Sequence, residues 1–113
     1  MIRKITEKSI CWVGSSKRHL RSFPAEARRD AGYQLRRVQE GLQPEDWKPM
    51  SSVGLGVIEI RIHCPHEFRV IYVARFSNAV YVLSAFEKKT EQTSDKELAS
   101  ARRAYAQLKS LQQ

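Results

Sequence analysis

Cysteine is scarce in this chain, and what the sequence lacks excludes several classes of protein. Cys11 and Cys64 are the two cysteines among 113 residues, and their separation fits neither a disulfide framework nor a zinc motif. The longest apolar runs, near residues 71–73 and 79–83, fall far short of the ~20 residues of a membrane span. The N-terminus carries charges where a signal peptide has an apolar segment. We therefore expect a cytoplasmic protein with reduced thiols and no membrane contact.

Acidic residues are also outnumbered, and this imbalance is the most informative feature of the composition. Twelve Asp and Glu oppose twenty Lys and Arg, which gives a net charge of +8. A small domain this basic is expected to bind a polyanion such as RNA, DNA or the ribosome, although a generally basic soluble surface is the alternative. The length suits a single domain over residues 1–113, and 42% hydrophobic residues suffice for a core.

Helical periodicity appears in two long segments. Residues 17–21 are expected to form a helical turn, and a longer helix should follow, with Ser22 as its N-cap and Pro24 in its first turn. This helix should end at Gly41. Its apolar residues recur at helical spacing: Ala27, Ala31, Leu35, Val38 and Leu42. Near the C-terminus the capping box Ser94–Glu97 predicts the start of a second long helix.

Four segments have the pattern of strands. Residues 10–13 form a short apolar run, and residues 57–62, 68–75 and 79–86 follow one another with short links. Consecutive strands with short links predict an antiparallel meander, and residues 43–56 are expected to be a loop because they contain two prolines and two glycines. We therefore expect an α+β fold, with a small, mostly antiparallel sheet of about four strands, N-terminal helices and a C-terminal helix packed on it.

Cations interrupt or end the apolar strands at Arg61, Arg69, Lys88 and Lys89. If residues 57–62 pair with residues 68–75, Arg61 and Arg69 come close together, and the next strand delivers the two lysines. A cation in a half-buried strand is costly without a partner, and a phosphate could be that partner. The alternative is that Glu59 pairs with Arg61 or Arg69 and that the lysines form a solvated strand end.

The same segments carry a resemblance to a known family. Residues 57–61 (VIEIR), 68–74 (FRVIYVA), 80–90 (VYVLSAFEKKT) and 94–103 (SDKELASARR) resemble the phage-derived Gp49-like, HigB-type branch of the RelE/ParE toxin superfamily. The resemblance covers most of the chain, from about Cys11 to Tyr105. One departure is that residues 86–95 contain no histidine, whereas some members carry a His or Tyr near this position.

The resemblance implies a RelE-like fold and a toxin of a type II toxin–antitoxin system. Such a toxin enters the ribosomal A site and cuts mRNA by attack of the ribose 2′-OH on the adjacent phosphate, without a cofactor. It also implies an antitoxin with a helix-turn-helix domain, through which alone the toxin would contact operator DNA. By this analogy Arg61 and Arg69 hold the phosphate, and Lys88 or Lys89 is the base or acid. Both lysines remain candidates.

Further residues have weaker signals. Arg28, Arg29, Arg36 and Arg37, on the outer face of the first long helix, could contact ribosomal RNA, or they could form a solvated face. His63, Cys64 and His66 suggest a metal, but their spacing favours a turn, so we expect no metal site. His63 could instead contact the substrate. Tyr105 lies on an apolar stripe, which favours a place in the core over the alternative of a catalytic role.

Two other functions share the expected fold. One is a non-enzymatic inhibitor of DNA gyrase, as in the ParE branch. The other is an inactive relative that only binds its antitoxin and regulates its operon. The cluster of cations favours the nuclease, because inhibition of gyrase does not require phosphate chemistry.

Overall fold

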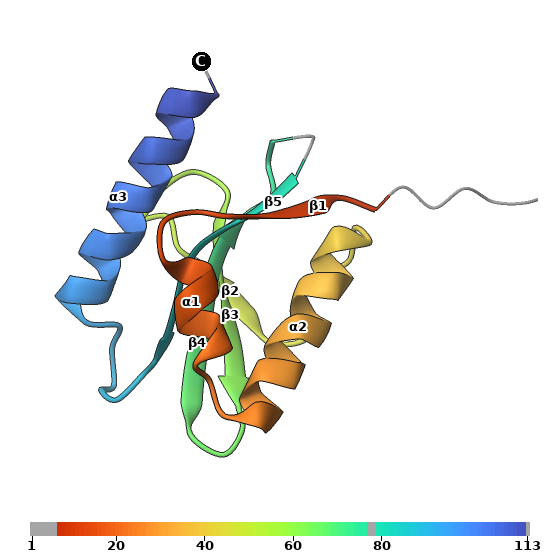
Figure 1. Ribbon diagram of the computed structural model, residues 1–113. Helices are drawn as coiled ribbons and strands as arrows, with labels where there is room; N and C mark the ends of the chain where they lie inside the picture. The colour runs from red at the N-terminus through yellow and green to blue at the C-terminus, as the bar shows by residue number, and fades with distance from the viewer. Residues whose placement is uncertain (1–6, 77–78, 113) are drawn as a thin grey trace, which may run out of the picture.

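One sheet with helices on both faces organises the chain (Figure 1). The computed structural model describes residues 7–76 and 79–112. Its elements are β1 (Ser9–Trp12), α1 (Ser16–Arg21), α2 (Ala25–Gln39), β2 (Trp47–Pro49), β3 (Val57–His63), β4 (Glu67–Val73), β5 (Ala79–Glu87) and α3 (Asp95–Leu111). The expected α+β class, with helices at both ends of the chain packed on a mostly antiparallel sheet, is confirmed.

The sheet has five strands in the order β1-β5-β4-β3-β2. Strands β3, β4 and β5 form the predicted antiparallel meander, and β1 joins the edge of β5 in parallel. The fifth strand, β2, lies within the segment that was expected to be only a loop and pairs with β3. It has three residues and ends at Pro49, which is too short for an alternating pattern to show.

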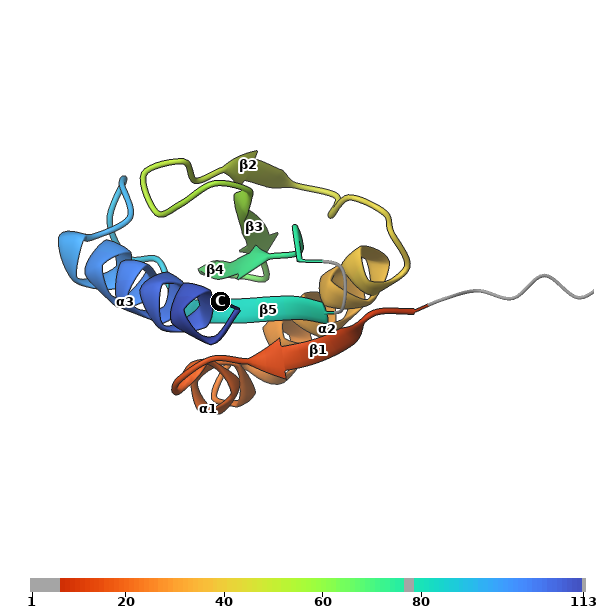
Figure 2. The same ribbon diagram turned by 90° about the horizontal axis from the view of Figure 1, so that it is seen from above.

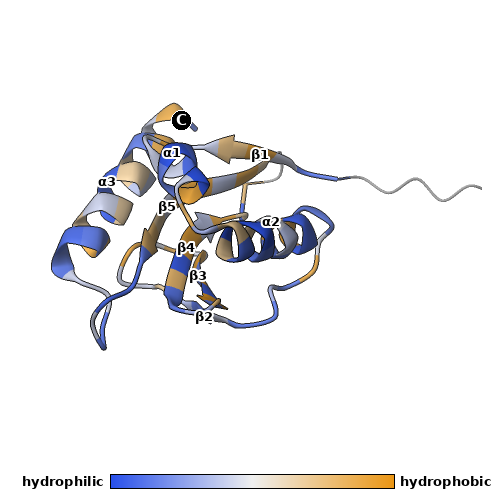
Figure 3. Ribbon diagram, turned by 60° about the horizontal axis from the view of Figure 1, so that its bottom comes forward, coloured by the Kyte–Doolittle hydropathy of each residue, from blue (hydrophilic) through white to orange (hydrophobic). Residues whose placement is uncertain are grey.

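Each face of the sheet has its own hydrophobic core. In Figure 2 α2 and α3 lie on opposite sides of the sheet. Helices α1 and α2 and the link between them cover one face of the sheet. Leu20, Phe23 of the link and the apolar stripe of α2 pack against Ile60, Ile62 and their neighbours. Helix α3 covers part of the other face with Ala101, Tyr105 and others. In Figure 3 the long helices alternate between hydrophilic and hydrophobic colours, as expected of helices with one buried stripe.

The helix ends differ in part from the expectation. Helix α2 begins after Pro24, and the Ser22 hydroxyl donates a hydrogen bond to the His19 carbonyl, so Ser22 does not cap α2. Leu42 lies beyond the helix and is 51% exposed. Helix α3 begins as predicted, because the Ser94 hydroxyl oxygen accepts a hydrogen bond from the Glu97 backbone N–H. Within residues 7–76 and 79–112, no helix is long and apolar enough to cross a bilayer.

Candidate functional site

The β3–β4 hairpin places the predicted arginines side by side. Arg61 and Arg69 are direct register partners, which confirms that pairing of these strands brings them close together. On the neighbouring strand, Phe86 of β5 lies opposite Arg69. Residues two apart on a strand share a face, so Glu59, Arg61 and His63 line one side of β3. This side belongs to the face of the sheet that α3 covers only in part.

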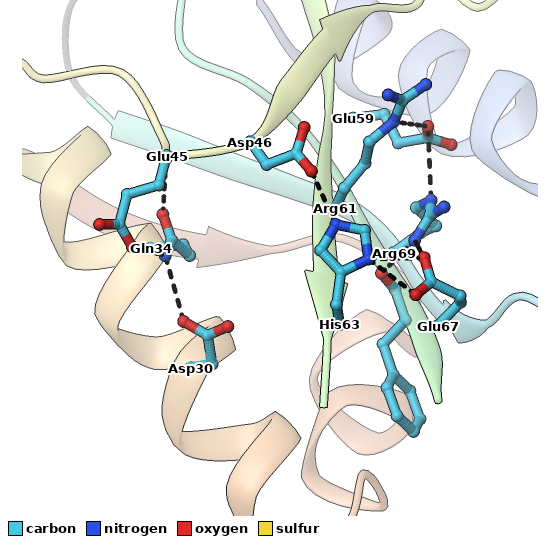
Figure 4. A network of polar contacts seen from close by, with 10 residues as sticks. Asp30, Gln34, Glu45, Asp46, Glu59, Arg61, His63, Glu67 and Arg69 are labelled. Carbon is cyan, nitrogen blue, oxygen red and sulfur yellow. Dashed lines mark hydrogen bonds and ion pairs between the residues drawn. The ribbon is translucent and has the colours of Figure 1, made fainter. Parts of the chain in front are cut away.

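Glu59 is the centre of this polar face (Figure 4). Its side chain is 1% exposed, and its Oε1 lies 3.7 Å from Arg69 Nε, 3.9 Å from Arg61 Nε and 4.0 Å from Lys48 Nζ. The Thr93 hydroxyl, from the loop before α3, donates a 3.0 Å hydrogen bond to Glu59 Oε2. Lys48, Arg61 and Arg69 therefore share a buried carboxylate as their partner. This agrees with the alternative in which Glu59 pairs with Arg61 or Arg69 across the strands.

Arg69 lies inside the protein. Its side chain is 5% exposed and donates hydrogen bonds to Glu67 Oε1 and to the Phe68 carbonyl, at 3.1 and 2.9 Å. Its distance to Glu59 is too long for a hydrogen bond, and the buried Nε atoms of Arg61 and Arg69 have no hydrogen-bond partner among residues 7–76 and 79–112. This geometry suits Arg69 to positioning Glu59 and Glu67 rather than to reaching a ligand at the surface.

An open groove of about 430 Å³ lies beside this network. We call it the Arg61 groove, and its lining includes Lys48, Ser52, Arg61, Lys88, Gln92 and Thr93. Arg61, whose side chain is 34% exposed, reaches the groove from β3. The Lys88 backbone N–H donates to the Glu67 carbonyl, which continues the β4–β5 pairing and brings Lys88 to the same groove. Lys89 is exposed and does not line it.

Lys48 is a residue of the groove that sequence reasoning missed. It lies opposite Glu59 in the β2–β3 pairing, and its ammonium group is 4.0 Å from Glu59. A buried Glu59 calls for cations from both neighbouring strands, but this burial is visible only in the structure. Without knowledge of β2, the sequence offered no reason to choose Lys48 over other lysines.

His63 lies at the end of β3 between two carboxylates. Its ring nitrogens are 2.7 Å from Asp46 Oδ2 and 2.7 Å from Glu67 Oε2. The hydrogen bonds to Asp46 and Glu67 raise the pKa of His63 above its ordinary value of 6.5. The hydrogen bond from His63 in turn lowers the pKa of Glu67 below 4.5. Because Glu67 also accepts a hydrogen bond from Arg69, His63 is connected to the buried network through Glu67. His63 does not line the Arg61 groove.

The neighbouring residues of the HCPH segment do not assemble a metal site. Cys64 Sγ lies 3.5 Å from Glu26 Oε2, and desolvation raises the pKa of its thiol. In the part of the chain that the structure describes, no group of three or more His, Cys, Asp or Glu side chains could hold a metal ion. The segment instead turns the chain from β3 to β4, as its proline predicts.

Stability should depend on pH through His63. A group whose pKa is raised on folding stabilises the protein below its unfolded pKa, and this contribution is lost as pH rises through the folded value. Replacing His63 by Gln should therefore lower the free energy of unfolding most between about pH 4.5 and 6.5, by no more than ~1 kcal/mol because the pair is exposed. Below this pH range the stabilisation by His63 also declines, because Glu67 becomes protonated as pH falls through its lowered pKa.

Urea unfolding of both proteins across this pH range measures the effect. In an Asp46→Asn background the loss of stability caused by His63→Gln should be smaller and should disappear at a lower pH, because the hydrogen bond to Asp46 is the largest cause of the raised pKa of His63. A stability difference between the wild type and His63→Gln that grows above pH 7 would contradict the proposed linkage.

The other candidates lie elsewhere. Arg28, Arg29, Arg36 and Arg37 belong to α2, on the opposite face of the sheet from the Arg61 groove. Three of them have partners: Arg28 donates to the Arg21 carbonyl, Arg37 to the Gln43 carbonyl, and Arg36 pairs with Glu7 and Glu40. Tyr105 is 7% exposed in the core, as its place on the stripe of α3 predicted.

The fold and the groove define a small α+β protein with a basic groove beside a buried network of charges. The chain belongs to the phage-derived protein Gp49-like family (DUF891), which matches residues 18–106. This family is often related to toxin–antitoxin systems. Among curated proteins, none matches the chain significantly.

Proposed function

We propose that the protein is the toxin of a type II toxin–antitoxin system and acts as a ribosome-dependent endoribonuclease on mRNA. The observation that carries this proposal is the Arg61 groove, where Lys48, Arg61 and Lys88 line one hollow. Membership of the Gp49-like family supports the link to a toxin. The net charge of +8 favours a polyanionic substrate and the ribosome.

The proposed reaction is an attack of the ribose 2′-oxygen on the adjacent phosphorus. A new bond forms between the 2′-oxygen and phosphorus, and the bond from phosphorus to the 5′-oxygen breaks. The 2′-OH gives its proton to a base, and the leaving 5′-oxygen receives one from an acid. The phosphate gains negative charge in the transition state, which nearby cations stabilise.

The roles follow from the position of each side chain. Arg61 presents a planar guanidinium that can hold two phosphate oxygens. Lys88 is our candidate for proton transfer because it lines the same groove, whereas Lys89 lies outside it. Arg69, from inside, positions Glu59, which in turn holds Arg61 and Lys48. We place the α2 arginines in contact with ribosomal RNA, away from the reaction.

The proposal includes partners. A cognate helix-turn-helix antitoxin would neutralise the toxin and connect it to operator DNA. The ribosome and mRNA would be its targets, in the cytoplasm.

Induced expression without antitoxin tests the function. We expect arrested growth and new mRNA 5′ ends at codon boundaries. Relaxed plasmid with intact mRNA would instead indicate gyrase inhibition, as in the ParE branch. Normal growth with a correctly folded protein would indicate an inactive relative that acts in antitoxin binding and operon regulation.

A further inference from the structure

A second groove lies between α1 and α3. Strand β1 pairs with β5 only as far as Val82, so the rest of β5 has helices beside it on that edge. Two hollows of about 330 and 390 Å³ meet there. We call them together the α1–α3 groove: His19 of α1 faces Lys96, Ser100 and Arg103 of α3, over Ser84 and Phe86 of β5.

The α1–α3 groove and the Arg61 groove lie on different sides of α3. Leu98 and Thr93 line the Arg61 groove, whereas Ser100 and Arg103 line the α1–α3 groove. Arg102 points toward the Arg61 groove, since its Nε donates to the carbonyl of Ser52. The new groove is therefore separate from the site of the proposed reaction.

The cations around this groove have no internal partner. Lys17, Arg18 and Arg21 of α1 line a hollow that adjoins it at Gly14 and Ser15. Within residues 7–76 and 79–112, the side chains of these cations and of Arg103 form no ion pair or hydrogen bond, in contrast to the cations that share Glu59. A gathering of unpaired like charges creates a positive potential that an anion relieves.

Ser84 offers a hydroxyl to a ligand in the groove. It is 4% exposed and lines the groove, yet its hydroxyl has no hydrogen-bond partner among the described residues. Its hydroxyl oxygen is not among the fully buried unpartnered atoms, so it is open to the groove and free to hydrogen-bond a ligand there. Ser100 and Gln107 add further donors along the same wall.

We propose that the α1–α3 groove binds the phosphodiester backbone of a nucleic acid strand. Arginine, lysine, serine and glutamine are among the side chains that contact phosphate oxygens. The hollow around Ser84 is lined by His19 and Arg103 with no acidic side chain, and Glu87 and Glu97 lie only in the hollow toward the end of β5. This inference goes beyond the proposed function, because binding here requires no cleavage and uses none of the residues of the Arg61 groove.

Two matched substitutions on α3 test the proposal. Ser100→Glu places a carboxylate in the groove one turn from Arg103, and Ser110→Glu makes the same change on the exposed part of the helix outside the groove. Fluorescence anisotropy with a labelled single strand of about 12 nucleotides, as RNA and as DNA, measures affinity at several salt concentrations. Circular dichroism checks the fold.

We expect Ser100→Glu to weaken binding about tenfold at low salt and to reduce the salt slope by roughly 0.7 per lost phosphate contact. Ser110→Glu should bind within about twofold of the wild type. Preference for RNA over DNA would identify RNA as the ligand, and equal affinity would identify the shared backbone; both support the proposal. If Ser100→Glu does not fold, Arg103→Gln compared with Lys109→Gln serves the same purpose.

If Ser100→Glu and Ser110→Glu weaken binding of the strand equally, the proposal is overturned, because affinity would then depend on the net charge of the protein and not on the groove. A polyglutamate peptide that binds more tightly than either strand, and is lost in Ser100→Glu, would show a protein-docking surface instead. Growth inhibition separates this inference from the proposed function, since failure of RNA binding here leaves the tests of Arg61 and Lys88 unaffected.

Discussion

Arg61→Gln should lower the rate of mRNA cleavage about 100-fold and abolish growth inhibition, while the protein stays folded. Arg61 is the guanidinium that lines the groove from β3, and loss of one group that stabilises transition-state charge typically costs 10²–10³ in rate. Glu59 keeps Arg69 and Lys48 as partners in this variant, so the buried carboxylate is not left alone. Single-turnover cleavage on programmed ribosomes measures the effect.

The two adjacent lysines provide the matched control. Lys88→Gln should reduce cleavage to a similar extent, because Lys88 lines the groove, and Lys89→Gln should have a much smaller effect. The pH dependence of the cleavage rate then shows whether Lys88 transfers a proton or only supplies positive charge. Loss of a proton-transfer group removes one limb of the pH–rate profile, whereas loss of a charge alone does not. Full activity of Arg61→Gln and Lys88→Gln would show that the Arg61 groove is not the reaction site.

The sequence predicted the part of the site that lies on regular strands. Alternation located β3 and β4, and a short turn between them was enough to pair Arg61 with Arg69. The same parity placed Glu59 on that face, but alternation does not say how deeply a face is buried. Burial of Glu59 and Arg69 comes from β5 and the loop that carries Thr93, which are distant in sequence.

The part that the sequence did not predict depends on short or irregular segments. The strand β2 has three residues, so no periodicity reveals it, and Lys48 could not be assigned to the groove. Lys88 and Lys89 were indistinguishable because the bulge between Ile71 and Tyr72 shifts the parity of β5 against β4. Only three-dimensional pairing of Lys88 with Glu67 decides which lysine enters the groove.

Arg69→Ala should destabilise the protein by about 3–5 kcal/mol, the usual cost of removing one partner of a buried ion pair. The side chains of Glu59 and Arg69 are 1% and 5% exposed, so the variant leaves a buried carboxylate short of a partner. Lys48→Ala removes a partner of the same carboxylate that is 44% exposed, and should cost under ~1 kcal/mol. Urea unfolding measures both.

A double variant shows whether the cost comes from the unpaired charge. Glu59→Met combined with Arg69→Met should be less destabilised than the sum of the two single changes, because apolar side chains of similar size leave no charge uncompensated. Additive losses would indicate that the two side chains act independently. If Arg69→Ala unfolds at the same urea concentration as the wild type, Arg69 does not hold the network together. Loss of toxicity in that stable variant would then place Arg69 in direct contact with the substrate.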